Sequence, residues 1–493
     1  MDKQTALDLL DEKQDFLFSV SDSIWDNPET DYTETVSSGI LMDALKKEGF
    51  TVTSGLAGIP TAFSGSYGSG SPVIEILGEF DALSGLSQKA CATEKEALEP
   101  GGNGHGCGHN LLGTGSLAAA IAVKEYLKGS KKPGTIIYFG CPAEEGGSAK
   151  AFMARDGVFK GVDIALSWHP NQLNSVWAFS TLANVRIHYF FKGVSAHAGT
   201  SPHLGRSALD ALELMNMGVQ FLREHIIPEA RIHYAITNTG GDAPNVVQAE
   251  AESVYLIRAP KNDQVREIYE RVNQIARGAA MMCGVEVEIQ LEKACSNILV
   301  NHTLEEVLYE NMKAVGLPEY TEEEYAFASA IQDTMPGRQK LADRFERIMG
   351  EKGRVLGEQY DKKSIYSFIL PYRPSEKPLS GSSDVGDVSW VCPTSQIVAA
   401  TCAGGTPEHT WQMVSQGKSS IAHKGLLYAG KVLAAAAIDP GRSGACKKGG
   451  RRVSEKNRAR RLSAAASQGC KALDEEIKGK GDAGYVEREK RTW

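Results

Sequence analysis

The sequence lacks the features that mark several classes of protein. No apolar run among its 493 residues approaches the roughly 18 residues that suggest a membrane-spanning helix. The amino terminus has acidic residues where a secretory signal would have a basic segment followed by an apolar one. Its nine cysteines are an odd number scattered from Cys91 to Cys470, which does not suit a disulfide framework. These absences predict a cytoplasmic globular protein with reduced thiols.

Most of the chain also lacks the positive charge that binding to nucleic acid requires. Residues 1–440 carry a net charge of −16, which excludes most nucleic-acid-binding proteins. Residues 441–493 differ, because they contain 15 Lys and Arg against 7 Asp and Glu and few large apolar side chains. This composition predicts a basic tail that is disordered or loosely helical. A basic arm for nucleic acid is the alternative.

The order of apolar segments predicts an α/β protein with more than one domain. Between residues 72 and 170, short runs rich in Val, Ile and Leu alternate with helical stretches, which is typical of a largely parallel sheet. From residue 184 the order becomes strand, helix, two strands, helix and strand, as in a ferredoxin-like α+β module. We therefore expect a main domain in two parts, 1–183 and 302–440, interrupted by a second domain at 184–301 and followed by the tail.

The segment GHGCGHN, residues 104–110, holds three potential metal ligands between glycines: His105, Cys107 and His109. Further candidates lie at or after the ends of apolar runs elsewhere in the chain: Glu144, Glu145, His169 and His409. Thiolate, imidazole and carboxylate are the groups that bind zinc and similar ions. Because parallel strands end at the same edge of a sheet, we expect these side chains to converge on a dinuclear metal site.

Each candidate has a simpler explanation when it is taken alone. A histidine before proline, such as His169, is commonly a hydrogen-bonded loop residue, and adjacent glutamates commonly form a solvated turn. The glycine-rich loop would also suit a structural half-site or a phosphate-binding turn. The convergence of three separate segments on one sheet edge favours the metal site. One of two adjacent carboxylates can then bind metal while the other transfers protons.

Several motifs, taken together, resemble one protein family. They are, in order, GEFDALSGLSQ, NGHGCGHNLLGTG, GCPAEEGGSAK, WHP, SAHAGTSPHLGRSALDA, HYAITNTGGDAPNVVQAEAE, SSDVGDVSW and HTWQMVSQGKSSIAHKG. This set, spread from about residue 15 to residue 438, is similar to that of the M20 metallopeptidases and amidohydrolases. The resemblance implies a zinc-peptidase-like catalytic α/β domain, interrupted by a ferredoxin-like lid that also forms the dimer.

The resemblance also implies roles for individual residues. Glu144 matches the general acid/base of the family. Five residues match the ligands of two divalent ions, Zn or Mn: Cys107, His109, Glu145, His169 and His409. Cys107 stands where many relatives have a bridging aspartate. In the lid, His197 and Asn245 match residues that stabilise the oxyanion, and His197 would do so in the site of the neighbouring subunit.

The chain departs from the family pattern beside the proposed ligands. Many M20 peptidases have a histidine ligand where this chain has Glu79. Asp81 is therefore expected to orient a ligand, and His105 or Glu79 is a candidate to complete a coordination sphere. Asn110 also stands where the amidohydrolase branch usually has aspartate.

The activity that the resemblance implies is hydrolysis of the amide between an aromatic acyl group and an acidic amino acid, as in p-aminobenzoyl-glutamate. The carboxylates of such a substrate need cations, for which Arg206 and Arg258 of the lid are candidates, although either would equally serve in a structural salt bridge. Indole-3-acetyl-aspartate and dipeptides are alternative substrates, and a non-catalytic partner subunit is an alternative function. The implied partner is a second copy bound through the lid, or a homologous A subunit.

Overall fold

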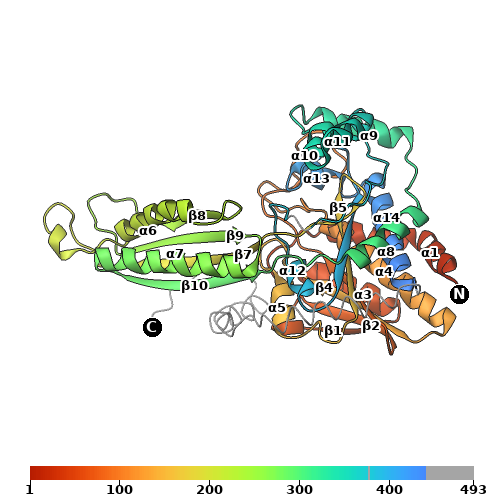
Figure 1. Cartoon of the computed structure of the whole chain (residues 1–493), viewed down its shortest axis with the longest axis horizontal. Coiled ribbons are helices and arrows are strands. Elements are labelled where there is room, and N and C mark those ends of the chain that lie inside the picture. Colours follow the sequence, from red (N-terminus) through yellow and green to blue (C-terminus); the bar gives the residue numbers. More distant parts are fainter. Residues whose placement is uncertain (376–377, 440–493) are drawn as a thin grey trace.

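The computed structural model describes residues 1–375 and 378–439 and contains two β-sheets from different parts of the chain (Figure 1). One has seven strands in the order β1-β2-β4-β3-β5-β11-β6, and the other has four in the order β10-β7-β9-β8. This arrangement confirms the predicted α/β class with an inserted α+β module. The predicted basic tail, 441–493, lies outside the described residues.

The seven-stranded sheet has a parallel centre with antiparallel strands at its edges. The parallel strands are β3 (Val73–Glu79), β4 (Gly134–Cys141), β5 (Ile164–Asn171) and β11 (Thr394–Ala400). The antiparallel strands are β1 (Thr51–Ser54), β2 (Phe63–Ser69) and β6 (Ser175–Val176). The parallel strands are almost entirely buried, because helices cover both faces. Their carboxyl ends therefore form one edge of the sheet, where candidate ligands can meet.

A large core on one face of this sheet includes residues of six helices. They are α1 (Lys3–Glu12), α2 (Gln14–Trp25), α3 (Thr35–Lys47), α4 (His109–Ser130), α8 (His302–Val315) and α14 (Ser420–Ile438). The opposite face packs against α5 (Ala149–Arg155) and α12 (Val385–Ser389). Of the described helices, α14 alone is long and apolar enough to cross a membrane, and most of it is buried against α4 and the sheet, as in a core helix.

The four-stranded sheet forms a separate body, the lid, that projects from the larger sheet in Figure 1. Its elements are, in order, β7 (Ala183–Lys192), α6 (Ala208–Leu222), β8 (Arg231–Asn238), β9 (Glu250–Ala259), α7 (Asn262–Cys283) and β10 (Glu286–Cys295). All neighbouring strands are antiparallel, and the lid has its own apolar core. This order and pairing are those of a ferredoxin-like module.

Further helices lie near β5 at the top of Figure 1. They are α9 (Glu322–Asp333), α10 (Leu341–Met349), α11 (Glu351–Tyr360) and α13 (Trp411–Gln416). Short 3-10 turns occur at Leu56–Gly58, Pro202–Leu204 and Arg223–His225. Leu341 and Phe345 of α10 pack in one apolar cluster with Leu173, which follows β5 closely in the chain. This packing places α10 beside the carboxyl edge of the large sheet.

Candidate metal centre

The glycine-rich loop places two candidate ligands at the amino end of α4. Gly108 caps this helix with a φ of 74°, and a side chain there would meet Pro170 and Met413. Only glycine adopts that backbone conformation without strain. The resulting turn buries Cys107 and His109, and it holds the Cys107 Sγ 3.4 Å from the Nε2 of His169 on β5.

A strained turn after β4 presents the two adjacent glutamates. Ala143 before them and Ser148 after them adopt left-handed φ values of 53° and 61°. His409, in the loop between β11 and α13, has a φ of 59°, and its Nε2 lies 3.3 Å from the Oε1 of Glu145. A non-glycine residue in this conformation costs about 1–3 kcal/mol, and such strain is concentrated at functional sites.

The described residues contain three groups of potential ligands, of which one consists of Glu79, His109 and Glu144 and the other two share one sulfur atom. Cys107, His109 and His169 make the first group. Cys107, Glu145 and His409 make the second, and in each group the donor atoms lie within 4.8 Å of one another. A thiolate common to both groups is placed to bridge two ions. The structure therefore brings together all five residues that the resemblance indicated as ligands.

The donor atoms fit a divalent ion better than they fit internal hydrogen bonding. Among the described residues, the Nε2 of His109 and the Oε1 of Glu145 are buried without a hydrogen bond. Burial raises the pKa of the Cys107 thiol, and the nearby carboxylate of Glu145 raises it further. Ionisation of this thiol thus needs a cation beside it, and thiolate, imidazole and carboxylate are the ligand types of zinc sites.

Asp81 belongs to neither group that contains Cys107, but it contacts one member of each and so orients them. Its Oδ1 lies 2.8 Å from the Nδ1 of His109, and its Oδ2 accepts a hydrogen bond of 2.9 Å from the backbone N–H of Glu145. This contact turns the Nε2 of His109 toward the ligand group. His105 does not reach that group, because its Nε2 lies 3.1 Å from the carbonyl oxygen of Ile24 and burial lowers its pKa to about 4.

The environments of the two adjacent glutamates move their pKa values in opposite directions. Burial raises the pKa of Glu144, and the carboxylates of Glu79 and Asp384 raise it further. Burial would also raise the pKa of Glu145, but the ion-pair contact with His409 and the charge of His109 lower it to about 2. A carboxyl that binds protons readily beside one that stays ionised is the arrangement expected for an acid/base next to a ligand.

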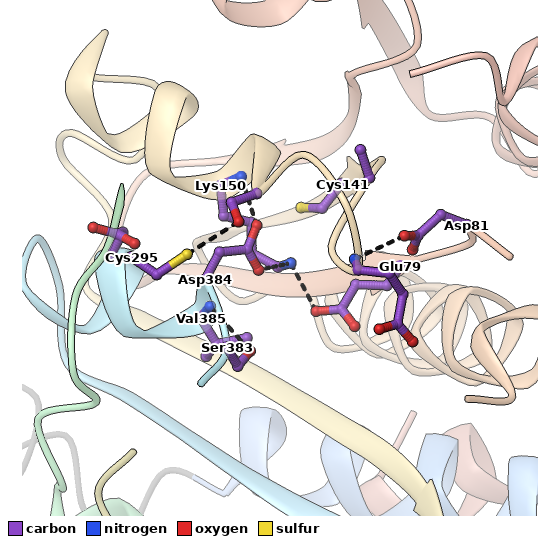
Figure 2. A network of polar contacts seen from close by, with 12 residues as sticks. Glu79, Asp81, Cys141, Lys150, Cys295, Ser383, Asp384 and Val385 are labelled. Carbon is purple, nitrogen blue, oxygen red and sulfur yellow. Dashed lines mark hydrogen bonds and ion pairs between the residues drawn. The ribbon is translucent and has the colours of Figure 1, made fainter. Parts of the chain in front are cut away.

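A buried ion network, which the sequence did not predict, joins Lys150 to Glu79 and Asp384 (Figure 2). The Nζ of Lys150 lies 2.7 Å from the Oε1 of Glu79 and 2.5 Å from the Oδ1 of Asp384. The Oδ2 of Asp384 also accepts a hydrogen bond of 2.9 Å from the backbone N–H of Lys150. The other oxygen of Glu79 lies 3.4 Å from His109 Nε2, so the network connects α5 and α12 with the ligand side chains.

Replacement of Lys150 with methionine is expected to destabilise the protein by about 3–5 kcal/mol, because it leaves the buried carboxylates of Glu79 and Asp384 without their cation. Chemical denaturation measures this change. Lys46, an exposed residue that pairs with Asp43, is a matched control, and its methionine variant should change stability by less than about 1 kcal/mol. Equal stability of the Lys150→Met variant and the unaltered protein would show that the network contributes nothing to the fold.

The structure places His197 and Asn245 together, but not at the metal ligands. A bridge joins His197 to Val246, and the N–H of Ala198 donates to the carbonyl oxygen of Asn245. Both residues are exposed and lie beyond the Lys192 end of β7, a strand of ten residues that begins near the catalytic sheet. A strand of that length spans about 30 Å, so these residues lie far from the ligands of their own chain.

The two lid arginines occupy different positions. Arg206 is exposed in the loop before α6, and its Nη1 donates to the carbonyl oxygens of His203 and Gly205. Arg258, on β9, donates from Nη1 to the carbonyl oxygen of Ser380 over 3.4 Å and has a buried Nε without a partner among the described residues. The contacts of Arg206 support a structural role, and neither arginine contacts a candidate ligand within the described residues.

Comparison with known proteins agrees with this geometry. Residues 77–350 match the profile of peptidase family M20/M25/M40. The chain belongs to the M20 family. It is 51% identical to the B subunit of the p-aminobenzoyl-glutamate hydrolase of Escherichia coli, over 85% of this chain and 88% of that protein. Membership of the M20 family makes this chain a hydrolase that acts on amide bonds.

Two more distant members help to interpret the M20 chain. The A subunit of the Escherichia coli hydrolase is 28% identical over 39% of this chain and 44% of that protein. A dinuclear metal-binding M20 peptidase from Bacillus subtilis shares the fold, with a TM-score of 0.52 and 15% identity over 86% of this chain and 98% of that one. Lys150 lies in the motif GCPAEEGGSAK, and Asp384 lies in the motif SSDVGDVSW. Charged residues within these motifs were the available signal for the ion network.

Proposed function

We propose that this chain is a metal-dependent amidohydrolase that cleaves N-acyl acidic amino acids, with p-aminobenzoyl-glutamate as its substrate. The observation that carries the proposal is the pair of ligand groups that share Cys107, with Glu144 next to them in the chain. The 51% identity to one chain of a p-aminobenzoyl-glutamate hydrolase supports the choice of substrate.

Two divalent ions, Zn or Mn, would be held by the Cys107–His109–His169 and Cys107–Glu145–His409 groups. When bound, such ions polarise the amide carbonyl and lower the pKa of water toward about 7. Glu79 is a further oxygen donor beside His109, because its Oε2 lies 3.4 Å from the Nε2 of that residue. Asp81 would keep His109 and Glu145 in place, as its two hydrogen bonds indicate.

Glu144 would take a proton from the attacking water and deliver it to the leaving nitrogen. Its raised pKa suits this exchange, because a carboxyl of ordinary acidity would hold the proton too weakly. His197 would stabilise the oxyanion from the neighbouring subunit with Asn245 beside it. The Nδ1 of His197 accepts from the backbone N–H groups of Gly199 and Thr200, so the proton of a neutral ring is on the exposed Nε2. That N–H can donate to an oxyanion.

The lid offers the surface for a second copy or for a homologous A subunit. Strand β8 is an edge of the four-stranded sheet, and Tyr234 and Ile236 on it are exposed. Leu214, Met217 and Phe221 form an exposed apolar stripe on α6, at positions three and four apart. An unpaired edge strand beside an apolar helix face is typical of a surface that another chain covers.

The proposed reaction belongs in the cytoplasm. All seven cysteines within the described residues are free, including the exposed Cys91 and the candidate ligand Cys107. A reducing compartment preserves such thiols, and a cysteine ligand must stay reduced to bind metal.

The test is hydrolysis of a substrate panel by the purified chain, with Zn or Mn, alone and with a homologous A subunit. The panel contains p-aminobenzoyl-glutamate, indole-3-acetyl-aspartate and a neutral dipeptide. We expect the first to be cleaved with the highest kcat/KM and the activity to disappear after exhaustive chelation. Activity that survives chelation would contradict the metal mechanism. A purified chain that binds no metal would instead favour the non-catalytic partner subunit.

A further inference from the structure

A cavity of about 180 Å³ adjoins the candidate metal centre. One wall contains Asn171 and Gln172, which follow the ligand His169 by two and three residues. Another contains Glu408, which immediately precedes the ligand His409. Met413 also lines the cavity, and its side chain lies beside Gly108, which precedes the ligand His109. The cavity is in the right place for the part of a substrate next to the scissile amide.

One cation, Arg344 of α10, faces this cavity. Its side chain is partly buried, and burial lowers its pKa although Glu408 opposes that change. Within the part of the chain that the structure describes, no carboxylate lies at ion-pair distance from its guanidinium, and no hydrogen bond occupies it. By contrast, Arg354 on the next helix, α11, pairs with Glu358 at 3.1 Å. A partly buried guanidinium without an anion is poised to bind one.

The other polar groups of the cavity already have partners. The Oε1 of Glu408 accepts a hydrogen bond of 3.0 Å from the Nδ2 of Asn171. The Oε1 of Gln172 accepts one of 2.5 Å from the backbone N–H of Gly405. The side chain of Arg338 lies against Gly405, which brings a second positive charge near the same loop. The cavity thus combines a guanidinium that has no ion-pair partner among the described residues with a wall in which Glu408 and Gln172 each have one side-chain oxygen in another hydrogen bond.

We propose that Arg344 binds the side-chain carboxylate of the acidic amino acid in the substrate and so sets the preference for acidic over neutral side chains. This inference rests on the proposed function. It favours Arg344 over the lid arginines as the source of the cation, because Arg206 and Arg258 donate to carbonyl oxygens, whereas Arg344 lines the cavity described above. A guanidinium can hold a carboxylate through two parallel hydrogen bonds, which fixes the amide in one orientation.

The test uses the full-length Arg344→Ala chain and two substrates, p-aminobenzoyl-glutamate and p-aminobenzoyl-glutamine, which share the α-carboxylate and differ in the side-chain carboxylate. Loss of a charge-assisted hydrogen-bonded pair should raise KM for the glutamate substrate by about 10- to 100-fold, with a much smaller change in kcat and in either constant for the glutamine substrate. The Arg344→Lys variant should recover part of the loss. Arg354→Ala, a change of the same size on the neighbouring helix, is the control and should leave both substrates unaffected.

An equal effect of Arg344→Ala on both substrates, or no effect on the glutamate substrate, would overturn the assignment. Equilibrium binding of free L-glutamate provides a second measurement that does not need turnover. The unaltered chain should bind L-glutamate at least 10-fold more tightly than the Arg344→Ala chain, and equal binding would also overturn the assignment. If the unaltered chain binds L-glutamate through Arg344 but cleaves no member of the panel, the proposed function fails while the carboxylate subsite stands.

Discussion

Glu144→Gln is expected to lower kcat for amide hydrolysis by about 10²- to 10⁴-fold while the metal content stays unchanged. Glutamine has the shape of glutamate, but it cannot take a proton from water or deliver one to the leaving nitrogen. Glu144 belongs to a group of potential ligands with Glu79 and His109 but lies outside both groups that contain Cys107, so its loss should leave those two groups complete. Steady-state kinetics together with metal analysis of the same preparation measure both parts of the prediction.

The neighbouring Glu145→Gln variant is the matched control, because it makes the same chemical change one residue away. Glu145 belongs to a ligand group with Cys107 and His409, so this variant should lose bound metal as well as activity. Both variants should lose activity, so their metal content is the measurement that distinguishes them. A Glu144→Gln chain that retains full activity, or one that loses its metal, would contradict the division of roles between them.

Cys107→Ala is expected to abolish activity and to weaken binding at both metal positions, because its sulfur is common to the two ligand groups. Loss of a residue that merely orients a ligand costs about 10- to 100-fold in metal affinity. Removal of a shared ligand should therefore cost more than about 100-fold at each position. Metal titration with a competing chelator measures the two affinities separately.

Two further variants make the Cys107 prediction specific. His409→Ala removes a ligand from one group only, so one position should keep its affinity. Cys107→Asp supplies a carboxylate where many M20 relatives have a bridging aspartate, and it should restore part of the metal binding that alanine removes. Two metal ions bound to the Cys107→Ala chain with unchanged affinity would show that the sulfur bridges nothing.

The sequence was sufficient to predict that the candidate ligands lie close together, because several of them follow from local patterns. Glu145 closes the run that forms β4, His169 lies near the end of β5, and His109 begins a helix after a glycine turn. Parallel strands end at one edge of a sheet, so these positions must converge once the strand order is right. The ferredoxin-like order of the lid was predictable for the same reason, since the periodicity of its segments is strong.

The ion network and the arginine cavity were not predictable in this way. Lys150 and Asp384 are 234 residues apart, and only the packing of α5 against α12 makes them partners. Arg344 is one of several charged residues on α10, and no local pattern shows that it faces a cavity beside His409. His105 shows the limit of the local pattern, because alternation alone does not distinguish it from Cys107 and His109, whereas the fold turns its ring toward Ile24.

The exposure of His409 gives the two proposed metal positions different routes to solvent. Its side chain is 52% exposed and lies on a loop, whereas His109 is fully buried at the start of a long helix. An ion held by His409 and Glu145 would lie closer to solvent than an ion held by His109. The outer ion should therefore exchange faster than the inner one.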